Sequence, residues 1–476
     1  MLRETTNQLD SLFYPKSVAV VGASPSKNGR ANQWINGYIK LGFQGKIFPV
    51  HPSAETILGF KSYPSVRDIP EEVDLVIFSV PFAVVLQVMQ DCVEKGVKYV
   101  HLFTAGFSET GQEDQADLER QLLEIAQKGG VRLIGPNCMG LYCPESGLTW
   151  SEDFPKTAGP VGFVSQSGQL ASHFIWDGAM DGIQFSKVIS FGNACDLQSH
   201  DFLNYLGQDE KTEILGSYIE GLKDGRAFFE FARNITRKKP FVVWKGGQTE
   251  GGARATQSHT ASIAGSQKIW QSLCQQTGIV SVDSMEELIS TTVALKKMPL
   301  PRGTNVALVG GAGGGSVTMT DAAEKEGLKV PHLAEETQRK LAEFIPISGN
   351  SVRNPLDIGF SNVYRDENDF VRLFKLLNDD PIINAVIFFR GLRRGRGSRK
   401  DMNLLTSLML KGMEVIEKPV YIVLPGNRTL EGEALREEAQ DKYNNIGLPT
   451  FPSFTLAARV ISNLSQYYNY LFAHGF

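Results

Sequence analysis

The sequence predicts an α/β protein built from three doubly wound domains in series. One local pattern, a short β-branched run that ends in glycine or serine and leads into a helix-compatible stretch, recurs three times at intervals of roughly 140 residues. The copies are SVAVVGAS at residues 17–24, GPVGFVSQSG at 159–168 and TNVALVGGAGGG at 304–315. Because a doubly wound parallel sheet begins in this way, each copy marks the start of a domain.

Further apolar runs supply the remaining strands, and segments of helical period, for instance 117–128 and 286–296, lie between them. The strand candidates are DLVIFSVP at 74–81, KYVHLFTAG at 98–106, VRLIGP at 131–136, ILGSYIEG at 214–221, PFVVWKGG at 240–247, NAVIFFRG at 384–391 and KPVYIVLPG at 418–426. Proline-containing connections at 142–160 and 298–303 separate the domains. We therefore expect a Rossmann-like domain over residues 1–143 and two flavodoxin-like domains over 155–298 and 303–476.

Composition limits the classes of function. An apolar fraction of 42%, a charged fraction of 21% and a net charge of -4 give no basic surface for nucleic acid. The apolar runs are too short to cross a bilayer, and the N-terminus lacks the apolar core of a signal peptide. The five cysteines are scattered without the spacing of metal ligands, which is typical of a reducing compartment. We expect a cytoplasmic protein that binds neither membrane nor metal.

One segment, GGQTEGGARATQSHTASIAG at residues 246–265, carries a histidine, His259, in a glycine-spaced stretch. No period of helix or strand runs through the residues before His259, and the pairs Gly246-Gly247 and Gly251-Gly252 remove backbone restraints. We therefore expect a movable loop, which makes His259 a candidate shuttle. An isolated histidine of this kind is more often a solvated loop residue, so the assignment depends on its companions.

This segment resembles the phosphohistidine region of the acyl-CoA synthetases that form a nucleoside diphosphate, the superfamily of succinyl-CoA synthetase and the archaeal ADP-forming acetyl-CoA synthetases. Ala261 stands where that family usually has glycine; the family residues that are kept are Gly252, Ala253, Arg254, Ala255, Ser258, His259, Thr260, Ala264 and Gly265. The resemblance covers nearly the whole chain, and GPNCMG at 135–140 with GFVSQSG at 162–168 is its most specific part in the first half.

The resemblance implies that His259 becomes a phosphohistidine and that Glu220, at the end of the strand ILGSYIE, pairs with it. A carboxylate bonded to one imidazole nitrogen fixes the tautomer and leaves the other nitrogen free to attack phosphorus. Without its partner motifs, Glu220 would pass for a solvated glutamate at a sheet edge. The same resemblance makes Gln166, Ser167 and Gly168 a phosphate-binding turn, for which the alternative is an ordinary helix start capped by serine.

The first domain is expected to bind coenzyme A (CoA). Its loop GASPSKNGR at residues 22–30 offers backbone N–H groups at a predicted helix N-terminus, where phosphate is held favourably. The loop lacks the G-x-G-x-x-G dinucleotide fingerprint because Ser24 follows two residues after Gly22. The resemblance extends the CoA site to the ends of the neighbouring strands, and the expected residues are Gly22, Ser24, Asn28, His51, Pro52, Ser79, Val80, Pro81, Thr104, Ala105, Gly106 and Asn137.

No ligand is expected on the glycine run of the third domain, and the basic stretch RGLRRGRGSRK at 390–400 is either a solvated loop or a docking site for an acidic partner. As a whole, the resemblance implies an acid–thiol ligase: the alpha subunit of an ADP-forming enzyme that interconverts acyl-CoA, ADP and inorganic phosphate with a carboxylic acid, CoA and ATP. The sequence contains no ATP-grasp domain and no G-x-x-x-x-G-K motif. ADP or ATP with Mg²⁺ is therefore expected on an ATP-grasp beta subunit, in a hetero-oligomer such as α2β2.

Two other classes compete with the ligase interpretation. A non-catalytic CoA-sensing module is disfavoured because His259, Glu220 and the phosphate-binding turn are all present. An NAD(P)-dependent oxidoreductase is disfavoured because the glycine fingerprint is incomplete. The sequence leaves the identity of the carboxylic acid and the direction of the reaction open.

Overall fold

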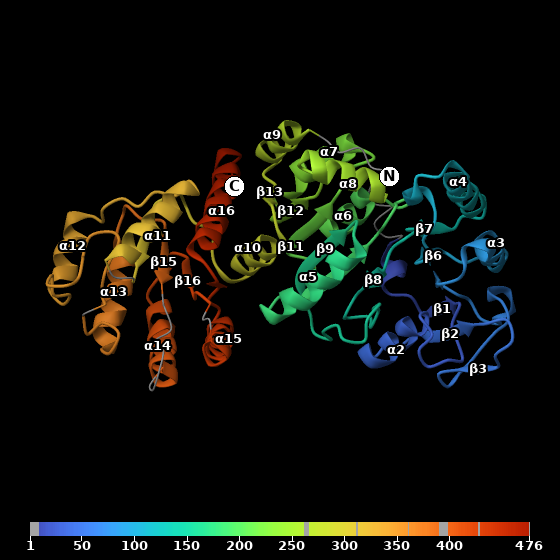
Figure 1. The fold of residues 1–476 in the computed structure, drawn as a ribbon, viewed down its shortest axis with the longest axis horizontal. Coiled ribbons are helices and arrows are strands. Elements are labelled where there is room, and N and C mark those ends of the chain that lie inside the picture. The colour runs from blue at the N-terminus through green and yellow to red at the C-terminus, as the bar shows by residue number, and fades with distance from the viewer. Residues whose placement is uncertain are drawn as a thin grey trace. The chain divides into compact units, whose positions relative to one another are not determined.

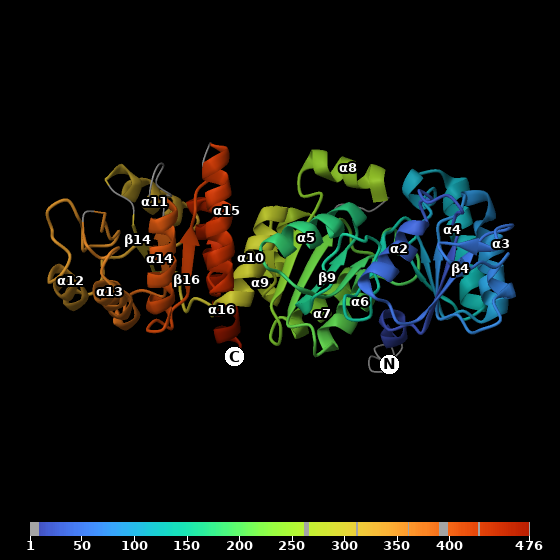
Figure 2. The same ribbon diagram turned by 90° about the horizontal axis from the view of Figure 1, so that it is seen from below.

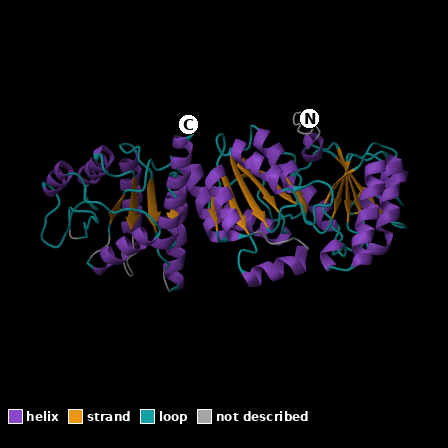
Figure 3. Ribbon diagram, turned by 90° about the horizontal axis from the view of Figure 1, so that it is seen from above, coloured by secondary structure: helices purple, strands orange, loops and turns teal. Residues whose placement is uncertain are grey.

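The computed structural model describes residues 9–260, 266–310, 313–359, 361–389, 398–426 and 429–475. The chain divides into two units, Met1–Met285 and Glu286–Phe476 (Figure 1). Both contain mainly parallel β-sheets with helices on their faces (Figure 3), which confirms the predicted α/β class. Among the described residues, the first unit holds two larger sheets and one two-stranded sheet, and the second unit holds one sheet. The three domain boundaries expected from the sequence remain predictions.

The first sheet has the order β2-β1-β5-β6-β7, and all its strands are parallel. This order reverses direction between β1 and β5, and such a switch point is where ligands bind in open α/β sheets. The strands are β1 (Ser17–Val21), β2 (Lys46–Val50), β5 (Leu75–Phe78), β6 (Tyr99–Leu102) and β7 (Arg132–Ile134), with a small hairpin of β3 (Thr56–Ile57) and β4 (Phe60–Lys61); the helices are α2 (Asn32–Leu41), α3 (Val85–Lys95) and α4 (Glu113–Lys128), with short 3-10 turns η1 (Val66–Asp68), η2 (Phe82–Val84) and η3 (Ser108–Thr110).

The second sheet repeats this topology. Its order is β13-β12-β11-β9-β10-β8, with a switch point between β9 and β11, and only β8 runs antiparallel. Its elements are β8 (Gly140–Tyr142), β9 (Ala158–Ser165), β10 (Phe185–Ser190), β11 (Ile214–Ile219), β12 (Phe241–Lys245), β13 (Val280–Val282), α5 (Gly168–Met180), α6 (Ser199–Gln208), α7 (Gly225–Ile235), α8 (Glu250–Thr260) and α9 (Gln267–Thr277).

The connection expected to be polar at residues 142–160 is partly an aromatic cluster. Tyr142, Trp150 and Phe154 are buried, and their rings pack edge to face with centroids 5.1–6.4 Å apart. Tyr142 also ends β8, which pairs with β10 of the second sheet. The chain therefore already belongs to the second sheet where this connection begins. The buried rings make the connection part of a hydrophobic core, although its prolines suggested a boundary between domains.

Most helices of the second sheet follow the expected amphipathic pattern. In α7, Asp224 caps the N-terminus by accepting a hydrogen bond from the Ala227 N–H at 2.8 Å. The buried residues of α7 recur at the spacing of one helical face: Phe228, Phe231, Ala232 and Ile235. Helix α8 differs, because it lies apart from the helices that cover the sheet (Figure 2).

The second unit contains one four-stranded parallel sheet, ordered β14-β15-β16-β17. Alternate residues of its strands enter two separate hydrophobic clusters, one on each face of the sheet. The elements are α10 (Met285–Lys297), β14 (Val306–Val309), α11 (Gly314–Lys325), α12 (Glu335–Ala342), α13 (Glu367–Asp379), β15 (Ala385–Phe389), α14 (Ser398–Met413), β16 (Val420–Val423), α15 (Leu430–Asn445), β17 (Thr450–Phe451) and α16 (Phe454–Ala473).

The structure describes only part of two sequence features of the second unit, the basic stretch and the glycine run. Residues 390–397, most of the basic stretch, lie outside the described residues, as do residues 311–312 of the glycine run. Within the described part of the chain, no helix is both long and apolar enough to span a membrane.

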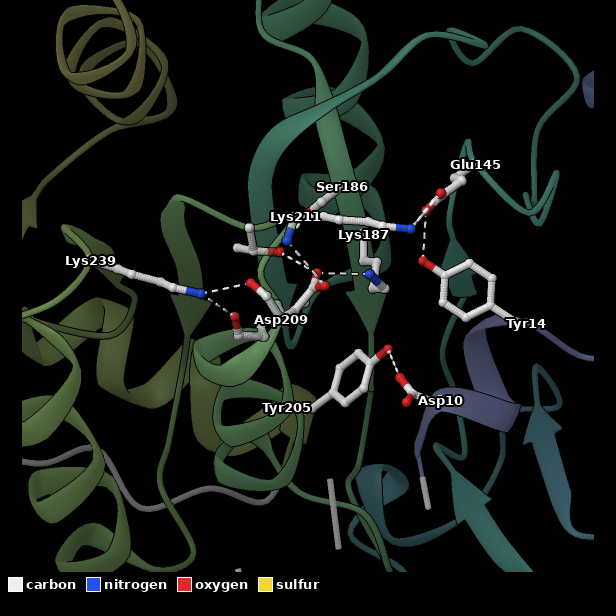
Figure 4. Close-up of polar contacts among 11 residues, drawn as sticks. Asp10, Tyr14, Glu145, Ser186, Lys187, Tyr205, Asp209, Lys211 and Lys239 are labelled. Atoms are coloured by element: carbon white, nitrogen blue, oxygen red, sulfur yellow. Dashed lines mark hydrogen bonds and ion pairs between the residues drawn. The ribbon is translucent and has the colours of Figure 1, made fainter. Parts of the chain in front are cut away.

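A buried ion pair fastens the N-terminal segment to the second sheet. Lys187 on β10 is 1% exposed, and its Nζ donates to Asp209 Oδ2 at 2.8 Å (Figure 4). The ammonium also lies 5.4–5.8 Å from the ring centroids of Phe13, Tyr14 and Tyr205. Because Phe13 stacks on Tyr205 at 4.8 Å, residues before the first strand are held against the second sheet.

Candidate functional site

The residues expected to bind CoA lie in the loops that follow β1, β2, β5, β6 and β7 at the carboxyl edge of the first sheet. The two loops at the switch point touch: Gly22 follows β1 with φ +93°, and a Cβ on it would come 2.1 Å from the Ser79 carbonyl oxygen. Only glycine fits this conformation and this space. The two loops therefore approach each other closely at the switch point, which is where open α/β sheets bind ligands.

The neighbouring loops hold one another through hydrogen bonds. The Thr104 hydroxyl donates to the Val80 carbonyl at 2.9 Å and accepts from the Val80 N–H at 3.3 Å. The Asn137 N–H donates to the Thr104 carbonyl at 3.1 Å. His51 is turned to its own loop, because its Nδ1 accepts from the N–H groups of Ser53 and Ala54 at 3.2 and 3.1 Å. The structure thus brings together the expected residues after β5, β6 and β7.

The loop at residues 22–30 leads into a helix, as the sequence predicted. Helix α2 begins at Asn32, whose side chain bonds Ser24 through both the N–H and the carbonyl, at 3.0 and 2.9 Å. These bonds fold the intervening residues into turns. Lys27 and Arg30 are exposed in this loop, which contains no acidic residue, so its charge suits a phosphate.

The turn expected to bind phosphate lies at the switch point of the second sheet. Ser167 caps α5, and its hydroxyl accepts from the Leu170 N–H at 3.3 Å, as the alternative interpretation required. Gln166 uses its side-chain oxygen to accept from the N–H groups of Glu220 and Gly221, at 2.9 and 3.2 Å. The end of β11 is therefore fixed directly to the turn after β9.

Glu220 sits at this edge and is 8% exposed. Its Oε1 accepts a hydrogen bond from the Tyr218 hydroxyl at 3.2 Å. The Lys245 ammonium donates to the carbonyl oxygens of Glu220 and Gly246, at 2.6 and 2.5 Å. Burial lowers the pKa of Lys245 below its usual range.

A cavity of about 660 Å³ opens beside these residues. It is lined by Gly221, Lys245 and Gly247, by the start of α7 and by residues along α9. The polar edge of the second sheet therefore continues into an open space of the size of ligand pockets.

His259 lies in a helix, which corrects the expectation of a loop for residues 250–260. Residues 250–260 form helix α8, and Thr249 starts it by accepting from the Gly252 N–H at 3.1 Å. The run from Ala253 to Ala255 favours a helix, and this preference outweighs the two glycines at the start. The side chains of residues 257–260, including His259, and all of residues 261–265 lie outside what the structure describes.

The two predicted binding edges meet within the first unit. Met139, from the GPNCMG loop, packs against Gly168, where a Cβ would lie 2.5 Å from Met139 Cγ. The Met139 N–H also donates to the Ser190 hydroxyl at 3.1 Å. Helix α8 lies beside η3, the turn that follows the expected CoA-binding residues of β6. The carboxyl edges of both sheets thus adjoin one another.

Asn193 links the same two edges. Its side-chain Nδ2 donates to Glu109 Oε2 at 2.5 Å and to Glu119 Oε2 at 3.1 Å. Glu109 in turn accepts from the N–H groups of Gly106 and Phe107, at 2.6 and 3.1 Å. The loop after β10 therefore holds the expected CoA loop after β6.

Sequence reasoning missed several polar residues of these edges. Tyr218 was within reach, because it lies two residues before Glu220 and so on the same face of the strand. Lys245 was hidden in an apolar run, and the bond of Asn193 to Glu109 joins residues far apart in the chain. Arg30, whose guanidinium lies 4.6 Å from the ring centroid of Phe103, was part of a quoted loop but not singled out.

Comparisons with known proteins agree on both sheets of the first unit. The family described as "CoA binding domain" matches residues 16–144, and the family described as "Succinyl-CoA ligase like flavodoxin domain" matches residues 158–295. The chain is 41% identical to the alpha subunit of ADP-forming acetate–CoA ligase II of Pyrococcus furiosus, over 80% of this chain and 81% of the relative.

Two further similarities extend over almost the full length. The alpha subunit of ADP-forming acetate–CoA ligase I of Pyrococcus furiosus is 34% identical, over 96% of this chain and 97% of the relative. Among solved structures, the dinucleotide-forming acetyl-coenzyme A synthetase 1 of Candidatus Korarchaeum cryptofilum, in complex with phosphate and ADP, is similar with a TM-score of 0.83 and 30% identity, covering 98% of this chain and 99% of that chain.

Proposed function

Because this chain belongs to the family of ADP-forming acyl-CoA ligases, we propose that it is the alpha subunit of such an enzyme and works through a phosphohistidine at His259. The substrate is a carboxylic acid or its CoA thioester. Acetate is the acid named for the two alpha subunits above. The loops around Gly22, Ser79, Thr104 and Asn137 are proposed to hold CoA.

The proposed reaction has three reversible steps. A phosphate oxygen attacks the thioester carbonyl, the C–S bond breaks, and the CoA thiolate leaves and takes up a proton. An imidazole nitrogen of His259 then attacks phosphorus of the acyl phosphate, and the P–O bond to the carboxylate breaks. Finally an oxygen of ADP takes the phosphoryl group from His259 to give ATP. Glu220 is proposed to stabilise the positive charge on the imidazole in the second step.

One observation carries this proposal: Gln166 joins the turn after β9 to the end of β11. Its side-chain oxygen accepts from the backbone N–H groups of Glu220 and Gly221, which supports a role of the start of α5, where phosphate is favoured, together with Glu220. The chain then leaves β12, the neighbour of β11, and leads directly into α8 with His259. This connection supports the proposal that the phosphate-binding turn and Glu220 act together with His259.

We propose that the partner is an ATP-grasp beta subunit that binds ADP with Mg²⁺. The name "subunit alpha" of the two relatives implies a second subunit in those enzymes. The complex of the similar Korarchaeum structure with phosphate and ADP agrees with a reaction that uses both molecules.

Labelling with radioactive phosphate tests the phosphohistidine. The chain is incubated with acetyl-CoA and labelled inorganic phosphate, and we expect label on protein that is acid-labile and base-stable. His259→Ala should abolish the label, whereas His173→Ala, at an exposed histidine of α5, should keep it. Normal labelling of His259→Ala would show that the nucleophile is elsewhere.

A further inference from the structure

Tyr218 touches both Glu220 and the start of the segment that carries His259. Its hydroxyl donates to Glu220 Oε1 at 3.2 Å, and its ring packs edge to face on Trp244 with centroids 5.0 Å apart. A Cβ on Gly246 would lie 2.6 Å from the same hydroxyl. Tyr218 is buried, so water has little access to this hydroxyl.

Gly246 is the first residue after β12, and its N–H donates to the Ile219 carbonyl at 2.9 Å. The absence of a side chain at Gly246 makes room for the Tyr218 hydroxyl, and the Tyr218 ring packs against the ring of Trp244. The hydroxyl is therefore held between the carboxylate and the backbone where the segment of His259 begins.

We propose that Tyr218 is a positioning residue for the phosphoryl-transfer step, because its hydroxyl fixes the orientation of the Glu220 carboxylate. Glycine is required at position 246 because any side chain there would displace this hydroxyl. The inference rests on the proposed function of Glu220 and His259. A hydrogen bond from a fixed donor to a carboxylate limits rotation about the last side-chain torsion of the glutamate. The carboxylate then meets the reacting imidazole in one orientation, without reorganisation.

Tyr218→Phe removes the hydroxyl and keeps the ring against Trp244. With acetyl phosphate as the phosphoryl donor and the full-length chain, we expect the maximal rate of His259 labelling to fall about ten-fold or more, with KM for acetyl phosphate and the affinity for CoA unchanged. The matched control is Tyr205→Phe, which removes another buried hydroxyl bonded to a carboxylate, that of Asp10 at 2.8 Å. The control should label within about two-fold of the wild type.

A double variant separates positioning from general damage. Gly246→Ala alone should slow labelling, because the new methyl group displaces the hydroxyl. In the Tyr218→Phe background the same change should add little, because no hydroxyl remains to be displaced. Equal labelling by Tyr218→Phe and wild type, or additive effects of the two changes, would overturn the role of Tyr218 and leave His259 intact. Label retained in His259→Ala would instead remove the proposed function itself.

Discussion

Gly22 and Ser79 show how single residues shape the predicted CoA site. The loop after β1 approaches the loop after β5 so closely that the backbone of Gly22 nearly touches the Ser79 carbonyl. The sequence predicted Gly22 as a residue of the CoA site, in a loop that offers backbone N–H groups to phosphate. The structure adds a second reason for glycine at this position, since a methyl group there collides with the Ser79 carbonyl.

We therefore expect Gly22→Ala to lower both stability and CoA affinity. A matched control, Gly42→Ala, has a similar φ of +85° but meets nothing within 4 Å. The control should cost only the strain of the left-handed backbone, about 1 kcal/mol, and keep CoA affinity. Urea unfolding and calorimetric titration with CoA measure the two effects. Equal losses in both variants would mean that the contact with Ser79 has no influence.

The buried pair of Lys187 and Asp209 gives a second prediction for single residues. Lys187→Met removes the ammonium and leaves the Asp209 carboxylate without its cation, so we expect about 3–5 kcal/mol less stability in urea unfolding at neutral pH. Arg233→Met is the control, because it breaks a surface pair with Glu230 and should change stability by less than about 1 kcal/mol. A loss in Lys187→Met as small as that of the control would contradict the importance of the pair.

The same pair predicts a dependence on pH. Burial acts to raise the pKa of Asp209, but hydrogen bonds from Lys187 and Thr212 outweigh it, and the pKa lies below its ordinary value. A carboxyl group with a depressed pKa in the folded state stabilises the protein above the pKa of the unfolded chain, about 4. That contribution is lost as pH falls through the folded pKa. The difference in stability between wild type and Lys187→Met should therefore be full at pH 6–7 and shrink below about pH 4; a difference constant down to pH 3 would exclude this linkage.

Helix α8 marks the limit of prediction at the scale of an element. Strands such as β1, β5 and β11 could be read from apolar runs that end in glycine or in a charged residue, because burial on both faces leaves a strong pattern. The segment of His259 has no apolar face, so its hydrophobic periodicity did not predict a helix. The glycine pairs suggested a loop instead. The cap by Thr249 and the alanines that follow decided the local structure instead. The hydrogen bonds of Gln166 cross from the end of β9 to the end of β11, and a single sequence does not display such contacts.

Gly247, in the link between β12 and α8, is expected to determine the position of α8. Gly247 has a φ of +70°, and a Cβ on it would lie 2.7 Å from the Thr256 hydroxyl oxygen inside α8. Gly247→Ala should displace α8 and slow His259 labelling about ten-fold or more, whereas Gly182→Ala, with φ +85° and open space, should not. Labelling rates of the two variants, measured with acetyl phosphate, check this. Similar rates would mean that the position of α8 does not depend on Gly247.

In the first unit, the two larger sheets share one topological feature. Each sheet reverses its strand order beside its first parallel strand, β1 in one and β9 in the other, and expected site residues lie at that reversal: Gly22 and Ser79 in the first sheet, Gln166 and Glu220 in the second. The repeated glycine-ended strands predicted doubly wound parallel sheets but not the order of their strands. The antiparallel strand β8 escaped prediction because it is only three residues long and is defined by its pairing with β10.

The lengths of α8 and of the linker before it limit how far His259 lies from the second sheet. Between the end of β12 and His259 lie four linker residues, at most ~3.5 Å each, and a helix that rises ~1.5 Å per residue. The histidine therefore stays within roughly 30 Å of the sheet edge while α8 is folded, so a nucleotide must be brought to it. We expect the lone chain to accept phosphate on His259 but to form no ATP from acetyl-CoA, ADP and phosphate, and addition of an ATP-grasp subunit with Mg²⁺ to restore ATP formation. A luciferase assay with and without that subunit measures this, with His259→Ala in the complete mixture as the control. Sustained ATP formation by the lone chain would place a nucleotide site on this chain and end the two-subunit proposal.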